Sequence, residues 1–315
     1  MRAVVAGYHT IGCLGLEALL RHGFDVRLVL THHDDPGETI WWRSLAATAE
    51  RAGIPVERPG DPAGKAFRDR IVACEPDFLF SFYYRRLIPT EVLRLARVAA
   101  LNLHGSLLPH YRGRAPVNWA LVNGETVTGV SLHHMTAGAD EGDLVDQERV
   151  PIGFADTAFT LYGRLHEAAV RLLDRTLPEL KAGTARRTPQ RLERGSYYGA
   201  RRPEDGRIDW NQPGVAIYNL IRAVTHPYPG AFTQWNGAKL LIWWALPVAV
   251  DPAPGVRGAA APGTVLAAGN EGITIATGGG ALRLVTVQFE GEPEQPAASL
   301  GDAGAGPSVG DRLGR

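Results

Sequence analysis

The segment AVVAGYHTIGCLGLEALLRHGFDVRLVL, residues 3–30, alternates the two hydrophobic patterns that decide the fold class. Its apolar run Ala3–Ala6 predicts a buried strand, and the glycine that follows predicts a turn. Leu14–His22 has a helical pattern that ends before Gly23, a residue suited to a helix C-cap. Val26–Leu30 is apolar again and predicts the next strand. A strand, a helix and a strand in this order indicate a βαβ unit in a mainly parallel sheet.

The same alternation continues through the first half of the chain. Further helices are expected at 40–51, 66–74, 91–97 and 157–177, and further strands at 78–83 and 99–103. Two strands with little between them, 127–134 and 143–150, indicate that part of the sheet is mixed. We therefore expect an α/β fold, with a Rossmann-like catalytic domain over residues 1–190.

Shorter strands, separated by Gly and Pro, follow a polar connection at 182–205 and a helical pattern at 208–224. They are expected at 231–235, 239–244, 263–267, 273–277 and 281–288. This spacing predicts a small β-rich, OB-like C-terminal domain over residues 203–290. Residues 291–315 are rich in Gly, Ala, Pro and acids, which predicts a weakly ordered tail.

The composition is that of an ordinary globular protein, with 45% hydrophobic and 21% charged residues in a chain of 315. Its 33 Lys and Arg balance 33 Asp and Glu, whereas proteins that bind phosphate backbones carry a basic surplus, so we expect no nucleic-acid partner. Two cysteines, Cys13 and Cys74, cannot form a disulfide framework, and no apolar run is long enough for a membrane span. We expect a cytoplasmic protein without membrane insertion. No heptad or interface pattern indicates an oligomeric state.

Two groups of residues fail the spacing that familiar sites require. The glycines of GYHTIGCLG, residues 7–15, do not match GxGxxG, and no lysine follows them, so neither a dinucleotide site nor a P-loop is indicated. The pairs His32-His33 and His133-His134 are adjacent, so in strands each pair points to opposite faces and cannot hold one metal ion. We expect no metal, and solvated or packing roles for these histidines.

The segment AALNLHGSLLPHYRGRAP, residues 99–116, places polar side chains in an otherwise apolar strand. Asn102 and His104 lie two residues apart and therefore project from the same face. Ligands bind at the carboxyl ends of strands in open α/β sheets, so the pair predicts a site, although the spacing alone also fits a satisfied structural pair. Asp140, in the small-residue turn AGADEGD, can approach closely. A carboxylate beside His104 would orient the ring and stabilise its protonated form.

Together with the later GADEGD, the stretch NLHGSLLPHYRGRAP resembles the folate-dependent formyltransferases, and the resemblance extends from the first strand to about residue 290. The stretches THHDDPGE, FSFYYRRLI and RGRAPVNWALVNGE are similar to one branch, the formyltransferase domain of bifunctional polymyxin-resistance enzymes. That branch uses 10-formyltetrahydrofolate to formylate UDP-4-amino-4-deoxy-L-arabinose for lipid A modification. The methionyl-tRNA branch usually reads RGAAPIQ where this chain has RAPVNW, residues 114–119.

The resemblance also implies roles for individual residues. His104 would be the proton donor and acceptor, Asn102 the stabiliser of the transition state, and Asp140 the carboxylate that favours protonated His104. The implied co-substrate is 10-formyltetrahydrofolate, without a metal, and its implied contacts are Arg86, Leu87, Ile88, Arg114, Thr136, Ala137, Gly138, Ala139 and Asp140. Candidates for binding the nucleotide sugar are Tyr111, Arg112 and Asn118. Candidates for reading its base or sugar, if they are not core residues, are Trp41, Trp42, Tyr83, Tyr84 and Trp119.

Two other acceptors stay open, namely another nucleotide-linked amino sugar and methionyl-tRNA. Binding of tRNA predicts a basic C-terminal domain, but residues 201–315 hold nine basic and ten acidic side chains, which disfavours it. His110 stands where the similar enzymes often have lysine. Those enzymes also continue into a decarboxylase domain, so we expect another polypeptide to supply that step. A folate-binding module without turnover would lack the three catalytic residues, and all three are present.

Overall fold

The computed structural model describes residues 1–249, 260–302 and 306–314. Within these limits the chain forms two compact units. The first contains Met1–Pro116, Thr126–Ile152 and Leu161–Ala200, and the second contains Val117–Glu125, Gly153–Thr160 and Arg201–Arg315. No helix of the described residues is long and apolar enough to cross a membrane.

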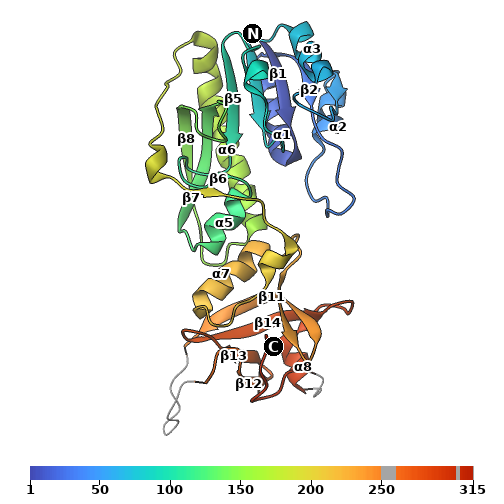
Figure 1. Cartoon of the computed structure of the whole chain (residues 1–315), viewed down its shortest axis with the longest axis vertical. Coiled ribbons are helices and arrows are strands. Elements are labelled where there is room, and N and C mark those ends of the chain that lie inside the picture. Colours follow the sequence, from blue (N-terminus) through green and yellow to red (C-terminus); the bar gives the residue numbers. More distant parts are fainter. Residues whose placement is uncertain (250–259, 303–305, 315) are drawn as a thin grey trace. The chain divides into compact units, whose positions relative to one another are not determined.

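A seven-stranded sheet in the order β3-β2-β1-β4-β5-β7-β8 forms the centre of the first unit (Figure 1). Its strands are β1 (Arg2–Gly7), β2 (Asp25–Leu30), β3 (Val56–Glu57), β4 (Phe78–Phe82), β5 (Ala99–His104), β7 (Val127–His134) and β8 (Leu144–Pro151). Pairings from β3 to β5 are parallel, whereas β7 is antiparallel to both β5 and β8. The mainly parallel α/β sheet with a mixed edge is therefore confirmed.

Helices pack against this sheet because their apolar residues recur at helical spacing. They are α1 (His9–Arg21), α2 (Leu45–Arg51), α3 (Lys65–Cys74), α4 (Thr90–Leu93) and α6 (Ala158–Ala182). One core cluster joins Phe67 and Ile71 of α3 to Leu28 of β2 and Leu79 of β4, all of them buried. On α1, a side chain at Gly15 would collide with the ring of Phe82, so this glycine permits close helix–strand approach rather than a turn.

Four helices have boundaries that differ by several residues from those expected from the sequence. Helix α1 begins at His9 instead of residue 14, and α4 ends at Leu93 instead of residue 97. Helix α2 begins at Leu45 instead of residue 40, because Ser44 caps it by accepting a hydrogen bond from the Ala47 amide. The longest helix, α6, continues beyond Pro178 to Ala182, since its buried face extends to Leu180 and outweighs the hydrogen bond that proline removes.

The second unit is built on an antiparallel sheet in the order β10-β11-β14-β13-β12, with β15 paired to β14. Its strands are β10 (Ala231–Trp235), β11 (Ala238–Val248), β12 (Val265–Gly269), β13 (Gly272–Ala276), β14 (Ala281–Phe289) and β15 (Gln295–Pro296). Helices α5 (Pro116–Val122), α7 (Gly214–Val224) and α8 (Ala297–Asp302) belong to it apart from Pro116. Helix α7 packs on β11 and β14 (Figure 1). The expected β-rich C-terminal region is confirmed.

Where the structure describes it, the end of the chain differs from the expectation of a weakly ordered tail over 291–315; residues 303–305 and 315 lie outside the described residues. Strand β15 pairs with β14, and α8 packs against β12, β13 and β14. Ala297, Leu300 and Leu313 are buried, and the Leu313 amide donates to the carbonyl of Gly263. The composition of this segment is typical of disorder, but a few apolar residues lie at positions that complete the core of this unit.

The 208–224 region also differs, because only α7 is helical there. The Ile208 amide donates to the Phe232 carbonyl, and Trp210 is buried with its indole N–H bonded to Thr233. In the first unit, the short strands β6 (Arg112–Gly113) and β9 (Tyr197–Tyr198) pair with each other. Two 3-10 turns, η1 (Leu192–Arg194) and η2 (Pro203–Gly206), complete the elements described.

Candidate active site

Asn102 and His104 lie on one face of β5, as their spacing predicts, next to the strand's carboxyl end. The antiparallel partner β7 places His133 opposite Asn102 and Ser131 opposite His104. His104, Ser131 and His133 are all less than 10% exposed. The register of these two strands therefore gathers four polar side chains on one buried surface.

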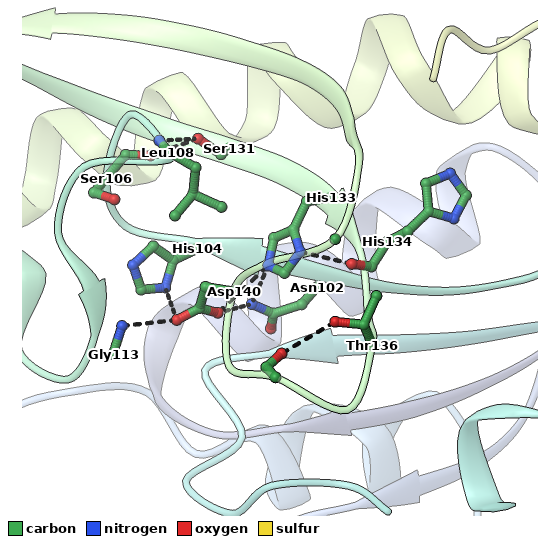
Figure 2. A network of polar contacts seen from close by, with 12 residues as sticks. Asn102, His104, Ser106, Leu108, Gly113, Ser131, His133, His134, Thr136 and Asp140 are labelled. Carbon is green, nitrogen blue, oxygen red and sulfur yellow. Dashed lines mark hydrogen bonds and ion pairs between the residues drawn. The ribbon is translucent and has the colours of Figure 1, made fainter. Parts of the chain in front are cut away.

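Asp140 reaches this surface from the loop between β7 and β8. Its backbone is in the left-handed region, at φ 59°, and its carbonyl accepts a hydrogen bond from the Gln190 side chain at 3.0 Å. Gln190 also donates to the carbonyl of Gly142, where a side chain would clash with the carbonyl of His134. These contacts fix the tight loop that aims the carboxylate at β5 (Figure 2).

The carboxylate of Asp140 lies among four partners (Figure 2). Its Oδ2 accepts a hydrogen bond from the Gly113 amide at 2.9 Å and lies 3.5 Å from Nδ1 of His104. Its Oδ1 lies 3.4 Å from the amide nitrogen of Asn102 and 3.4 Å from Nε2 of His133. The structure thus brings together the three residues proposed as catalytic, and it adds a second histidine.

These partners keep Asp140 ionised. Burial by itself would raise the pKa of this carboxyl, but the protonated imidazoles of His104 and His133, together with the Gly113 amide, hold that pKa well below its usual value. A carboxylate that stays charged near neutral pH can orient His104 and stabilise a proton on its ring without taking that proton.

The ring of His104 is fixed at both nitrogens. Nε2 lies 2.8 Å from the carbonyl oxygen of Tyr111, and a carbonyl can only accept, so Nε2 carries a hydrogen. A proton on Nδ1 would face Asp140. Ser106 donates to the His110 carbonyl at 2.6 Å, and Ser131 donates to the Ser106 carbonyl at 2.6 Å, which ties the loop after β5 to β7.

His133 is the residue that sequence reasoning missed, because its adjacency to His134 indicated only packing. Its Nδ1 donates to the His134 carbonyl at 2.8 Å, so in the neutral ring Nε2 is an acceptor. The Asn102 amide nitrogen lies 3.0 Å from this Nε2. Both hydrogens of the Asn102 amide therefore face protein groups, and its carbonyl oxygen has no partner among the described residues. The signal that pairs His133 with Asn102 is strand register, which sequence spacing alone does not contain.

The expected folate contacts lie on two loops. In the loop after β4, Leu87 is 63% exposed, and within the described chain the N–H groups of Arg86, Leu87 and Ile88 donate to no protein acceptor. The side chain of Arg114 donates to the Arg85 carbonyl at 3.2 Å, which joins it to that loop. In the loop 136–140, the Thr136 hydroxyl donates to the Gly138 carbonyl at 3.2 Å (Figure 2).

The three residues expected to bind the nucleotide sugar are mostly engaged in contacts with other protein groups. Asn118 is buried in the second unit and donates to the Ala223 carbonyl at 2.7 Å, so it does not support the expected role. Tyr111 is also buried, and its carbonyl, rather than its ring, faces the site through His104. Arg112 pairs with Glu141 at 3.0 Å, and its Nε is buried without a hydrogen-bond partner.

Among the described residues, no group of three or more His, Cys, Asp or Glu side chains is arranged to hold a metal ion. His133 is buried and belongs to the cluster, whereas His134 is only half-buried; His32 and His33 follow β2 and do not lie in a strand.

Two models of known protein domains match this chain. Residues 17–177 match the formyl transferase family, and residues 201–302 match the C-terminal domain of formyl transferases. The chain belongs to the formyl transferase family. This member has both family domains and carries the Asn102, His104 and Asp140 cluster in the N-terminal one.

Several solved structures share the fold of this formyl transferase. An N-formyltransferase from Helicobacter canadensis, in complex with folinic acid and dTDP-3-aminofucose, is 21% identical with a TM-score of 0.69, over 91% of this chain and 98% of that chain. WlaRD, a sugar 3N-formyl transferase, is 20% identical with a TM-score of 0.68, over 93% and 99%. HypX from Aquifex aeolicus, in complex with tetrahydrofolic acid, is 22% identical with a TM-score of 0.63, over 98% of this chain and 48% of that one.

Proposed function

We propose that this formyl transferase moves a formyl group from 10-formyltetrahydrofolate to the amino group of a nucleotide-linked amino sugar. The observation that carries the proposal is the cluster of Asn102, His104 and Asp140 at the carboxyl end of β5. The Helicobacter canadensis enzyme is described in complex with folinic acid and dTDP-3-aminofucose, and WlaRD in the presence of dTDP and 5-N-formyl-THF, which supports the two classes of substrate.

The two loops suit a folate. Exposed Leu87 offers an apolar surface to a ring system, and the unpaired N–H groups of residues 86–88 can bond the polar edge of a pterin. We assign the folate to this loop, together with Arg114 and residues 136–140. When bound, 10-formyltetrahydrofolate supplies the formyl carbon.

The protein's own contribution is proton handling and orientation. His104 takes a proton at Nδ1 from the attacking amine and returns it to the departing folate nitrogen, and ionised Asp140, whose Oδ2 lies 3.5 Å from Nδ1, stabilises the protonated ring between the two transfers while the Tyr111 carbonyl keeps Nε2 protonated. The Asn102 carbonyl oxygen, which has no partner among the described residues, can accept a hydrogen bond from the acceptor amine and so orient it.

The same geometry revises the role that the resemblance implies for Asn102. To donate to a developing oxyanion, its amide must rotate so that the N–H group leaves His133. Rotation places the Asn102 oxygen against Nε2 of His133, which is favourable only when that nitrogen is protonated. We therefore propose that the orientation of the Asn102 amide depends on whether His133 is protonated.

We propose UDP-4-amino-4-deoxy-L-arabinose as the first acceptor to test, because THHDDPGE, FSFYYRRLI and RGRAPVNWALVNGE resemble the polymyxin-resistance branch. The test incubates the purified protein with 10-formyltetrahydrofolate and, in separate reactions, this nucleotide, a dTDP-amino-deoxyhexose and methionyl-tRNA. Formylation of the arabinose nucleotide alone supports both the class and the sugar. Formylation only of the dTDP sugar keeps the class and overturns the sugar, and formylation only of tRNA overturns both.

A further inference from the structure

Residues 188–198 of the first unit, which we call the connecting segment, lie along both loops of the candidate active site. From the sequence they are only part of a polar connection, and the structure gives them the turn η1 and the short strand β9. Thr188 exchanges two backbone hydrogen bonds with Leu144, which follows the loop that carries Asp140, at 2.8 and 2.9 Å. At its other end the segment pairs with β6 through β9. The segment is therefore anchored beside the site at both ends.

Gln190 holds the loop that carries Asp140. Its Nε2 donates one hydrogen to the Asp140 carbonyl at 3.0 Å and the other to the Gly142 carbonyl at 2.5 Å. Asp140 has a φ of 59°, a left-handed conformation that is unfavourable for most residues with a side chain. Two hydrogen bonds from one side chain, on either side of Glu141, therefore help to keep the loop in this conformation.

The buried amide of Gln190 is explained by these two bonds rather than by packing. Both partners are carbonyls, which only accept, so the orientation of the Gln190 amide is determined. Its Oε1 is buried and has no hydrogen-bond partner among the described residues. Because a buried oxygen without a partner is unfavourable, an apolar side chain of similar size would suit packing alone better.

Ser196 holds the second loop in the same way. Its Oγ accepts a hydrogen bond from the Tyr111 amide at 2.9 Å, and its carbonyl accepts one from the Arg112 amide at 2.9 Å. Its own amide donates to the Pro109 carbonyl at 3.2 Å. Tyr111 also has a left-handed backbone, at φ 58°, so this loop too depends on contacts from outside it.

Both sets of contacts lead to His104. Oδ2 of Asp140 lies 3.5 Å from Nδ1 of the ring (Figure 2), and the Tyr111 carbonyl oxygen lies 2.8 Å from Nε2. The Gly113 amide, which donates to Oδ2 of Asp140, belongs to β6 and pairs with Tyr198 of the segment. Each group that orients His104 is thus itself fixed by the connecting segment.

We infer that Gln190 and Ser196 are positioning residues for formyl transfer, which rests on the proposed function. Gln190 holds the carboxylate of Asp140 against Nδ1 of His104, and Ser196 holds the Tyr111 carbonyl against Nε2. The ring therefore keeps one orientation while it takes the proton and returns it. Both residues act through the groups that they hold and not on the reacting atoms.

Initial rates at saturating 10-formyltetrahydrofolate, with the acceptor that the wild type formylates, test this inference. Gln190→Met keeps the size of the side chain and removes the donor, and it should lower kcat about 10²-fold, since a misplacement of about 1 Å has an effect on that order. Ser196→Ala removes one acceptor but keeps the backbone bonds, so it should lower kcat only about fivefold. Arg191→Gln changes an exposed side chain of the same segment and should keep the kcat of the wild type.

A double-mutant cycle separates positioning from a general structural role. If Gln190 acts through the carboxylate of Asp140, adding Gln190→Met to Asp140→Asn should lower kcat by less than about threefold. A general structural role predicts the same loss in both backgrounds. The inference is wrong for Gln190 if the two losses are equal or if Gln190→Met has the kcat of the wild type, and it is wrong for Ser196 if Ser196→Ala does.

Hydrogen exchange measured by NMR tests the same contact without turnover. The Gly113 amide should exchange with solvent at least about tenfold faster in folded Gln190→Met than in the wild type, because its acceptor on Asp140 is no longer held in place. It should exchange at the wild-type rate in Arg191→Gln. Unchanged exchange in Gln190→Met overturns the inference, whatever the enzyme formylates. If exchange rises as expected but the wild type formylates no amino sugar, the positioning role stands and the proposed function fails.

Discussion

Replacing His9 with glutamine should make the folded chain less sensitive to acid. His9 is 8% exposed, and its Nδ1 has no hydrogen-bond partner among the described residues. Burial, with smaller contributions from the positive charges of His166 and Arg85, lowers the pKa of His9 from 6.5 to about 3. Folding therefore requires a neutral imidazole at this position.

The sign and size of the effect follow from that pKa. Between pH 6.5 and 3 the unfolded chain binds the proton that the folded chain excludes, so the free energy of unfolding falls as the pH drops. Each pH unit in this window costs about 1.4 kcal/mol for one group. Lowering the pH from 8 to 5 therefore costs about 2 kcal/mol at His9 alone, because only the part below 6.5 contributes.

Urea unfolding at pH 8 and at pH 5, followed by tryptophan fluorescence, measures this difference. His9→Gln should lose about 2 kcal/mol less stability than the wild type between the two pH values. His33→Gln removes an exposed histidine and should lose as much as the wild type does. If His9→Gln and the wild type lose the same free energy of unfolding between pH 8 and pH 5, the reasoning is refuted, because a buried neutral His9 would then make no contribution to the acid sensitivity.

Three further substitutions test other parts of the molecule. Asp140→Asn should lower kcat and change the shape of the pH–rate profile, because the charge beside His104 is lost; a slower enzyme with an unchanged profile contradicts this. His133→Leu should lower kcat about 10²-fold, because the Asn102 side-chain amide on the neighbouring strand loses the contact that positions it. His134→Leu should leave kcat unchanged, and equal kcat values for the two variants would count against the contact between Asn102 and His133. Leu300→Ala should cost about 2–5 kcal/mol in urea unfolding, and a negligible cost would mean that α8 is not packed.

The sequence supports a prediction of those features that depend on near neighbours along the chain. The two-residue spacing of Asn102 and His104 places them on one face of a strand, and strand β5 has that geometry. The mainly parallel sheet and its mixed edge follow from the alternation of patterns and from the short gap between 127–134 and 143–150, whereas the strand order comes from the structure alone. Local periodicity is strong in these segments because their strands are buried.

The missed features depend on contacts between distant residues. His133 contacts Asn102 only because of the register between β5 and β7. The Asn118 side chain donates a hydrogen bond to a carbonyl of α7, more than a hundred residues away in the sequence. Helix α8 lies in a segment whose composition is typical of disorder, yet Leu300 is buried there against the sheet. Tertiary packing decides such cases and leaves little trace in local sequence.

The central claim is that His104 moves the proton during formyl transfer. The most direct test measures initial rates for the wild type and His104→Ala with 10-formyltetrahydrofolate and the nucleotide sugar that the wild type formylates, alongside folate binding by calorimetry. We predict that His104→Ala loses at least about 10²-fold in kcat while its affinity for the folate stays close to that of the wild type. Wild-type turnover in His104→Ala would contradict the account.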